Sequence, residues 1–150
     1  MKIYLAADHA GFELKEEIKK YLETQGKEIE DLGVFELDSD DDYPDFIAPV
    51  AKKVAENPKQ NRGIVLGGSG QGEAIVSNRF KGVRAAVYYG GNLDIVKLSR
   101  RHNDANVLSL GARFLTKEQA IEAVKLWLGT PFEGGRHAHR IEKIDKLLNC

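Results

Sequence analysis

Short apolar runs that stop abruptly at polar residues or glycines recur along the chain and predict buried strands. The first run is Lys2–Ala7, and it ends at the polar pair Asp8-His9. The run Gly63–Leu66 has no polar side, as is typical of a strand that is covered on both faces of a sheet. Further strands are predicted at 29–32, 84–88 and 107–110.

Apolar residues between these runs recur at helical spacing, with charged residues at the intervening positions. The segment 14–22 follows this pattern, and Gly26 is placed to end its helix. Thr116 and Gln119 form the capping-box pattern that opens a later helix, which Gly129 ends. Helices are also predicted over about 45–56, 73–79, 92–101 and 136–148.

Strands alternate with helices throughout, which predicts an α/β fold with a parallel sheet and helices on both faces. We expect a three-layer α/β/α, Rossmann-like domain with five parallel strands and an extended C-terminal helix. The sequence has no linker, internal repeat or low-complexity tract, so residues 1–150 are predicted to form one domain. Ligands of such sheets bind beyond the carboxyl ends of the strands. The segments that follow strands there are Asp8-His9, 67–73, the region near Tyr89, and Arg113.

Composition excludes several classes of protein. With 22 basic and 23 acidic residues the formal charge is −1, which gives no basis for a nucleic-acid partner. The single cysteine, Cys150, cannot form an intrachain disulfide or a four-thiolate zinc site. The first residues lack the long apolar stretch of a signal peptide, and no window approaches the ~18 apolar residues of a membrane span. We therefore expect a cytoplasmic protein without a membrane partner.

The most informative segment is Gly67-Gly68-Ser69-Gly70-Gln71-Gly72-Glu73. Its glycines allow backbone N–H groups to converge on an anion at the start of a helix. The segment lacks the lysine of a P-loop, and it fails the dinucleotide fingerprint, whose third glycine would fall at Glu73. A tight strand-to-helix turn is the simpler interpretation. Glu73 favours a functional one, because a carboxylate beside such a nest can move a proton while the nest stabilises an oxyanion.

Other polar residues have both a functional and a structural interpretation. Asp8 and His9 follow a strand, but Asp8 could cap the next helix and His9 could bond a loop. His102 could be a helix C-terminal cap. Arg136 and Arg140, four residues apart, share one helix face, which is suited either to solvent or to a phosphate.

Two further clusters do not fit a cation site. His137 and His139 would point to different sides of a helix, so we predict no metal site there. The acidic run 38–42 does not match the order of a calcium loop and is expected to be a solvated run of charge.

Five segments, in order, resemble type B ribose-5-phosphate isomerases, a family that includes galactose-6-phosphate isomerase subunits. The resemblance runs from Lys2 to about Leu148. The segments are Asp8-His9-Ala10-Gly11, Asp42-Tyr43-Pro44, the glycine-rich segment 67–73, residues 99–106, and Glu133-Gly134-Gly135-Arg136-His137.

The resemblance implies a metal-independent aldose–ketose isomerase of the pentose phosphate pathway that needs no cofactor. Such an enzyme interconverts D-ribose 5-phosphate and D-ribulose 5-phosphate through a cis-enediolate. Two alternatives stay open. One is the isomerisation of a six-carbon sugar phosphate, galactose 6-phosphate or allose 6-phosphate. The other is a protein that binds a phosphometabolite without catalysis.

The resemblance also implies residue roles. Family members use as base either a cysteine, at the position of Gly67, or a glutamate, at that of Glu73. Because the only cysteine is Cys150, the last residue, we expect Glu73 to be the base. His102, with Asp8, would open the furanose ring, in a division that stays open. The expected substrate-binding residues are Asp8, His9, Tyr43, Gly68, Ser69, Gly70, Gln71, Gly72, Asn103, Arg113, Arg136 and Arg140, with His9 and the three arginines at the phosphate.

The family's assembly implies a homodimer or a dimer of dimers with shared active sites. The resemblance implies that Glu73 is met from the neighbouring chain by His102, Asn103, Arg113, Arg136 and Arg140, and which of them cross stays open. The last predicted helix carries an apolar stripe that must be buried on its own sheet or on a partner, and we favour the partner. The stripe consists of Ile141, Ile144, Leu147 and Leu148.

Overall fold

The computed structural model describes residues 1–36 and 38–147. Within them, five parallel strands form one sheet in the order β2-β1-β3-β5-β4. The strands are β1 (Lys2–Ala7), β2 (Ile29–Asp31), β3 (Asn61–Gly67), β4 (Ala85–Tyr88) and β5 (Val107–Gly111).

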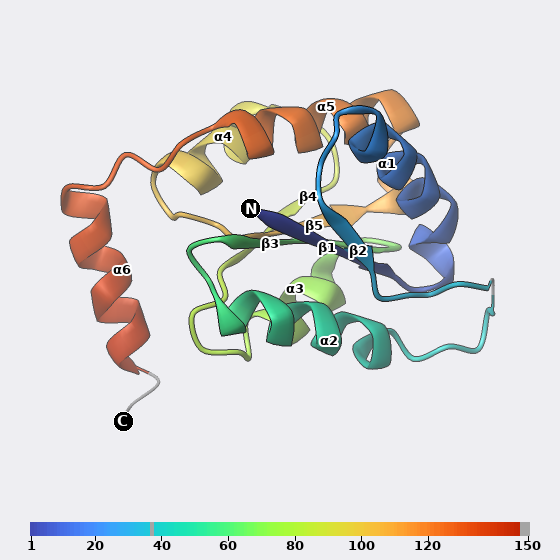
Figure 1. Ribbon diagram of the computed structural model, residues 1–150, viewed down its shortest axis with the longest axis horizontal. Coiled ribbons are helices and arrows are strands. Elements are labelled where there is room, and N and C mark those ends of the chain that lie inside the picture. The colour runs from blue at the N-terminus through green and yellow to red at the C-terminus, as the bar shows by residue number, and fades with distance from the viewer. Residues whose placement is uncertain (37, 148–150) are drawn as a thin grey trace.

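Helices cover both faces of this sheet (Figure 1). On one face lie α1 (Phe12–Thr24), α4 (Asp94–Arg101) and α5 (Lys117–Gly129), and on the other lie α2 (Tyr43–Glu56) and α3 (Gln71–Ser77). Two single-turn 3-10 helices, η1 (His9–Gly11) and η2 (Ala112–Phe114), follow β1 and β5. The predicted three-layer α/β/α arrangement is confirmed. None of the described helices is long and apolar enough to cross a bilayer.

The core is divided by the sheet into two apolar clusters. Ile18 of α1 and Trp127 of α5 belong to the first, together with side chains from one face of β1, β3 and β5. Val50 and Val54 of α2 pack with Val65 in the second. The central strand β3 is fully buried from its third residue onward, which explains why its sequence has no polar side.

Several elements begin or end a few residues from their predicted bounds. Helix α3 begins at Gln71 instead of 73, because Gly70 adopts a positive φ of 78° and turns the chain directly into the helix. Helix α2 begins at Tyr43, so that Pro44 lies in its first turn, where a missing N–H costs nothing. Strand β3 is longer than predicted at both ends.

Helix α6 (Arg136–Leu147) stands apart from the three layers. It projects at the end of the molecule where the strands begin, opposite the loop that joins β2 to α2 (Figure 1). Among the described residues of its apolar stripe, Ile141 is buried, while Ile144 is 50% and Leu147 69% exposed. Leu148 and Cys150 lie outside the described residues.

Candidate active site

The chain leaves the carboxyl ends of the neighbouring strands β1 and β3 toward opposite faces of the sheet, and in such sheets this is the place of the ligand-binding crevice. The backbone N–H of Asp8 donates to the carbonyl of Leu66 at 3.2 Å, which joins the two strand ends. The backbone N–H of Arg113, after β5, donates to the carbonyl of Gly68 at 3.1 Å. Three segments that are distant in sequence therefore meet here, as predicted from their positions after strands.

Glu73 is buried in this crevice, with 3% of its surface exposed. Its carboxylate lies against Gly67, and a Cβ added at Gly67 would overlap with it. Glycine at position 67 therefore creates the space that the carboxylate occupies. The positive φ of Gly70 starts α3 early enough to place Glu73 in its first turn.

Burial raises the pKa of Glu73, and the negative charge of Asp8 raises it further, against a hydrogen bond to the Glu73 backbone that lowers it. A carboxylate with a raised pKa is a stronger base than one in water. The environment of Glu73 is thus suited to taking a proton from a weakly acidic carbon.

Tyr43 reaches the same loop from the start of α2. A Cβ added at Gly72 would lie 2.7 Å from Cζ of Tyr43, so the glycine permits the ring to pack directly on the loop. The ring remains 37% exposed, in keeping with a side chain that lines an open pocket. Tyr89 also packs at this edge, against Gly111.

Arg113 and His9 bring positive charge to the crevice. Arg113 lies against the loop, since a Cβ at Gly68 would be 3.1 Å from its Nη1. The expectation that Arg113 reaches Glu73 from a neighbouring chain is therefore wrong, because η2 places it beside the loop of its own chain. The positive charge of Arg113 acts on His9, whose segment η1 contacts η2. An imidazole and a guanidinium, both suited to binding a phosphate, thus come from neighbouring turns of the chain.

Asp8 and His9 also have the structural roles that the sequence left open. Oδ1 of Asp8 accepts a hydrogen bond from the N–H of Gly11 at 3.1 Å and caps η1. Nδ1 of His9 donates to Oδ1 of Asp41 at 2.9 Å. Each contact uses one polar atom of the side chain, so both residues have a second polar atom to offer to a ligand.

The prediction that the acidic run 38–42 is solvated is wrong for Asp41. Its side chain is only 4% exposed, because the loop folds back onto η1 and delivers the carboxylate to His9. The uniform acidic run gave no signal for this, since Asp40 and Asp42 beside it are indistinguishable in pattern and both are exposed.

The other predicted site residues lie at the opposite end of the sheet, where the strands begin. The carbonyl of Asn103 accepts from Nε of Arg84 at 3.1 Å, directly before β4 begins. The N–H of Glu133 donates to the carbonyl of Arg101 at 3.0 Å, which fixes the start of α6 beside the end of α4. A strand as long as β3 spans roughly 20 Å. Within one chain, that length separates Glu73 from His102, Asn103, Arg136 and Arg140.

His102 has two neighbours to which the sequence assigned no role. Its ring stacks on that of His137, with centroids 4.2 Å apart and planes 12° from parallel. Nε2 of each ring lies near Oε2 of Glu133, at 3.8 Å for His102 and 3.7 Å for His137. The three side chains have metal-ligand chemistry and spacing. Nearly parallel planes at this distance are also the geometry of a stacked ring pair, which needs no ion to hold it together.

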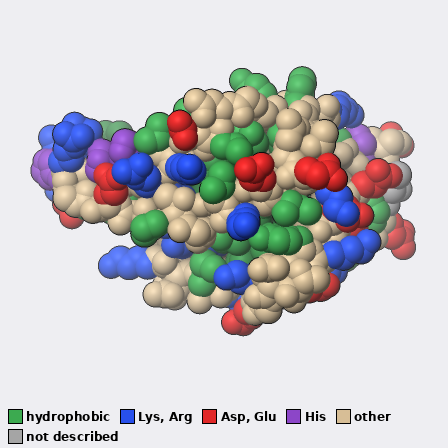
Figure 2. Space-filling model, turned by 90° about the horizontal axis from the view of Figure 1, so that it is seen from above, with side chains coloured by type: hydrophobic (Ala, Val, Ile, Leu, Met, Phe, Trp, Pro, Cys, Tyr) green, Lys and Arg blue, Asp and Glu red, His purple; other side chains and the backbone are tan. Residues whose placement is uncertain are grey.

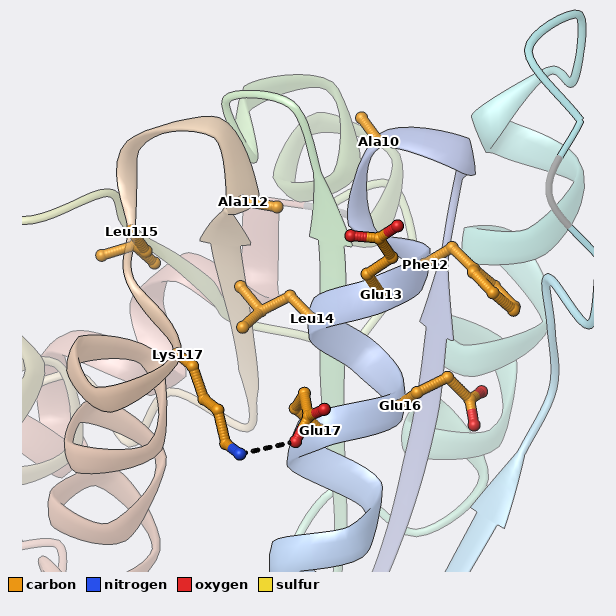
Figure 3. A pocket seen from close by; sticks show the side chains of 9 residues that line it. All are labelled: Ala10, Phe12, Glu13, Leu14, Glu16, Glu17, Ala112, Leu115 and Lys117. Carbon is orange, nitrogen blue, oxygen red and sulfur yellow. Dashed lines mark ion pairs between the residues drawn. The ribbon is translucent and has the colours of Figure 1, made fainter.

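A groove of about 500 Å³ beside the crevice has the wrong charge for a sugar phosphate (Figure 3). It lies between the starts of α1 and α5, and Glu13, Glu16 and Glu17 line it. Lys117 is already paired with Glu17 at 2.8 Å. The side chains of this groove would repel a phosphate, so it is not a candidate site for one.

The chain is similar to proteins of known family over nearly its whole length. The family model described as Ribose/Galactose Isomerase matches residues 3–144. The probable ribose-5-phosphate isomerase B of Mycoplasma pneumoniae is 43% identical over 142 residues, which are 95% of this chain and 91% of that protein. The ribose-5-phosphate isomerase B of Mycolicibacterium paratuberculosis is 41% identical over 95% of this chain and 88% of its own.

Solved structures show the same similarity. The ribose-5-phosphate isomerase B of Mycoplasma genitalium, with bound ribulose-5-phosphate, superposes with a TM-score of 0.95 at 40% identity, covering 99% of this chain and 96% of that one. The Clostridium thermocellum enzyme superposes with a TM-score of 0.93 at 42% identity, covering 99% and 98%.

Proposed function

Because the chain belongs to the ribose/galactose isomerase family, we propose that it interconverts D-ribose 5-phosphate and D-ribulose 5-phosphate with Glu73 as the proton-transferring base. Relatives about 40% identical over most of the chain carry this activity in their names, and one was solved with ribulose-5-phosphate. The observation that carries the role of Glu73 is its buried carboxylate in the space left by Gly67.

The reaction requires one proton to move between neighbouring carbons. Glu73 takes the proton from carbon 2 of the open-chain aldose, and the electron pair passes to the carbonyl oxygen on carbon 1 to form a cis-enediolate. Glu73 then returns the proton to carbon 1 while the hydroxyl proton on oxygen 2 passes to oxygen 1. The carboxylate ends as it began, so no cofactor or metal is needed for the balance. Backbone N–H groups of residues 68–72 would stabilise the charged oxygen.

The phosphate is held at the far end of the substrate. His9 and Arg113 supply positive charge from the chain that carries Glu73. A fixed phosphate restricts the reacting carbons to the neighbourhood of Glu73, so that binding energy at one end lowers the barrier at the other. Tyr43 lines the pocket between the two ends.

The remaining site residues reach Glu73 from a second copy of the chain. His102 and Asn103, which would open the ring and bind hydroxyls, lie a strand's length from Glu73 within one chain. Arg136 and Arg140, which would complete the phosphate site, stand on the projecting helix α6. Figure 2 shows Lys, Arg and His side chains gathered at the projecting end, whereas the opposite end carries side chains of both charges. A homodimer with shared sites joins these two halves.

The edge strand β4 offers a surface for this dimer. Its first three residues are only partly buried, and exposed apolar residues of α3 and α4 flank it. Those of Ile75 and Ile95 are each 58% exposed, and Leu98 is 37% exposed. An uncovered strand edge with apolar neighbours is an expected contact between subunits.

A comparison of substrates tests the function. Turnover of ribose 5-phosphate, galactose 6-phosphate and allose 6-phosphate is followed for the wild-type chain and for Glu73→Gln. We expect the five-carbon substrate to be turned over with the highest kcat/KM and Glu73→Gln to lose that turnover. Preference for a six-carbon sugar would reassign the substrate, and binding of all three without turnover would favour a phosphometabolite-binding protein.

The charged sugar phosphates are retained inside cells, which supports a cytoplasmic enzyme.

A further inference from the structure

Asp41 is a buried carboxylate directly behind His9. Its side chain is 4% exposed, and its Oδ1 lies 2.9 Å from Nδ1 of His9. An ionised carboxylate only accepts hydrogen bonds, so the hydrogen lies on Nδ1. Nε2 of the ring is then the atom that faces a ligand.

The charges around His9 come from three segments. Asp8, next to it in the chain, and Asp41, from the loop between β2 and α2, favour the charged imidazolium. Arg113 of η2 and burial favour the neutral ring. The hydrogen bond with Asp41 is the largest of these effects, and together they raise the pKa of His9.

The buried position of Asp41 carries an energetic cost. Among the described residues, its Oδ2 is buried and has no hydrogen-bond partner. A carboxylate in that position is costly, and a loop that needed only to be closed would be more stable with a neutral side chain there. The charge itself is therefore the feature that needs an explanation.

We propose that Asp41 is a positioning residue for substrate phosphate, which orients the His9 ring and keeps it cationic beside Arg113. This inference rests on the proposed function, in which His9 and Arg113 hold the phosphate. A phosphate monoester carries a charge of about −1.5 to −2 at neutral pH. Within the chain that carries Glu73, Arg113 supplies a positive charge to that phosphate, and the carboxylate of Asp41 favours the charged His9 ring against burial and Arg113, which favour the neutral ring.

Asparagine at position 41 separates orientation from charge. Asp41→Asn keeps an oxygen that accepts the hydrogen bond from Nδ1 but removes the negative charge. Asp40→Asn removes one charge from an exposed residue of the same loop and is the matched control. An NMR titration of the His9 ring, without substrate, should give a lower pKa in Asp41→Asn and an unchanged pKa in Asp40→Asn. An unchanged His9 pKa in Asp41→Asn overturns the proposal.

The consequence for phosphate is measured as a ratio between variant and wild type at each pH. Because the phosphate titrates equally with both proteins, the ratio of their dissociation constants for inorganic phosphate isolates His9. We expect a ratio near one below both His9 pKa values, about tenfold between them, and near one again above both. The KM for ribose 5-phosphate should follow the same curve, with kcat little changed.

A flat ratio with a lowered His9 pKa would overturn the phosphate role of Asp41. Absence of isomerase activity in the wild-type protein would refute the proposed function alone. The two failures are distinguishable because the titration and the binding of inorganic phosphate are read without turnover.

Discussion

At the scale of single residues, the position of Glu73 leaves no room for a side chain at position 67. The carboxylate of Glu73 fills the volume that any side chain at position 67 would need. A chain with this geometry therefore cannot also carry a cysteine base at position 67 without moving Glu73. The resemblance that implied two possible bases and the geometry around Gly67 support the same choice.

Replacing Glu73 by glutamine removes the base and keeps the shape of the side chain. We expect Glu73→Gln to lower kcat about 100-fold or more, with a much smaller change in substrate binding. Steady-state kinetics with ribose 5-phosphate measure both. Cys150→Ala is the control for the cysteine mechanism and should be silent, as should alkylation of Cys150. A Glu73→Gln variant with a near-normal rate would remove Glu73 as the base.

The raised pKa of Glu73 also predicts how stability depends on pH. Between the ordinary glutamate pKa and the raised one, the folded chain binds more protons than the unfolded chain, so the free energy of unfolding falls as pH rises. The stabilising contribution is complete below the ordinary value and is lost through the raised one. Glutamine at position 73 carries no charge, so the stability of Glu73→Gln does not have this dependence on pH.

Thermal unfolding measures this effect. Glu73→Gln should unfold at a higher temperature than the wild type at pH 7.5, and the difference should disappear near pH 4. Glu23→Gln, at an exposed position of α1, should show no such trend. A less stable Glu73→Gln at pH 7.5 would contradict the cost of burial inferred for this carboxylate.

At the scale of elements, a buried ion pair fastens α1 to β2. Nζ of Lys15 has no exposed surface and lies 2.6 Å from Oδ2 of Asp31, and Lys19 approaches the same oxygen at 3.4 Å. Oδ1 of Asp31 accepts from the N–H of Gly33 at 3.0 Å, at the start of the loop that carries Asp41. The pair therefore connects helix packing to the position of a loop that reaches the site.

Lys15→Met leaves the Asp31 carboxylate buried with weaker compensation. Removal of one partner from a buried pair costs about 3–5 kcal/mol, and we expect the lower end because Lys19 remains. Chemical denaturation of the variant measures the loss. The control is Lys20→Met, because the Lys20 side chain is 69% exposed and its pairing with Glu17 at 3.8 Å is screened by solvent and contributes little to stability. Equal stability of the two variants would show that the buried pair contributes nothing.

The elements were predictable because their signals are local. Among the described residues, sequence patterns located the β-strands and the α-helices but not the 3-10 helices η1 and η2. The ends of the elements differed where a single backbone angle decides, as at Gly70. Asp41 was not predictable, because the burial of one aspartate within an acidic run depends on a loop folding back onto η1. The pairing of His102 with His137 likewise depends on where α6 begins relative to α4.

For the whole molecule, the residues of the candidate site fall into two groups at opposite edges of one sheet. The resemblance implied a division between them but put Arg113 in the wrong group, since η2 places Arg113 beside the loop of its own chain. Asp8 and Glu73 lie at the carboxyl ends of the strands, and His102 and Arg136 lie at the amino ends. A site that requires both groups requires two chains, and this requirement can be tested without a structure of the dimer.

Mixed dimers of inactive variants provide that test. Glu73→Gln and His102→Asn damage different halves of the site, so a dimer with one chain of each has one site with both defects and one intact site. Random exchange of subunits should restore about a quarter of the wild-type activity from two inactive proteins. A mixture of Glu73→Gln with Asp8→Asn, which damage the same half, should restore nothing. If neither mixture regains activity although the subunits have been shown to exchange, the complete site lies within one chain.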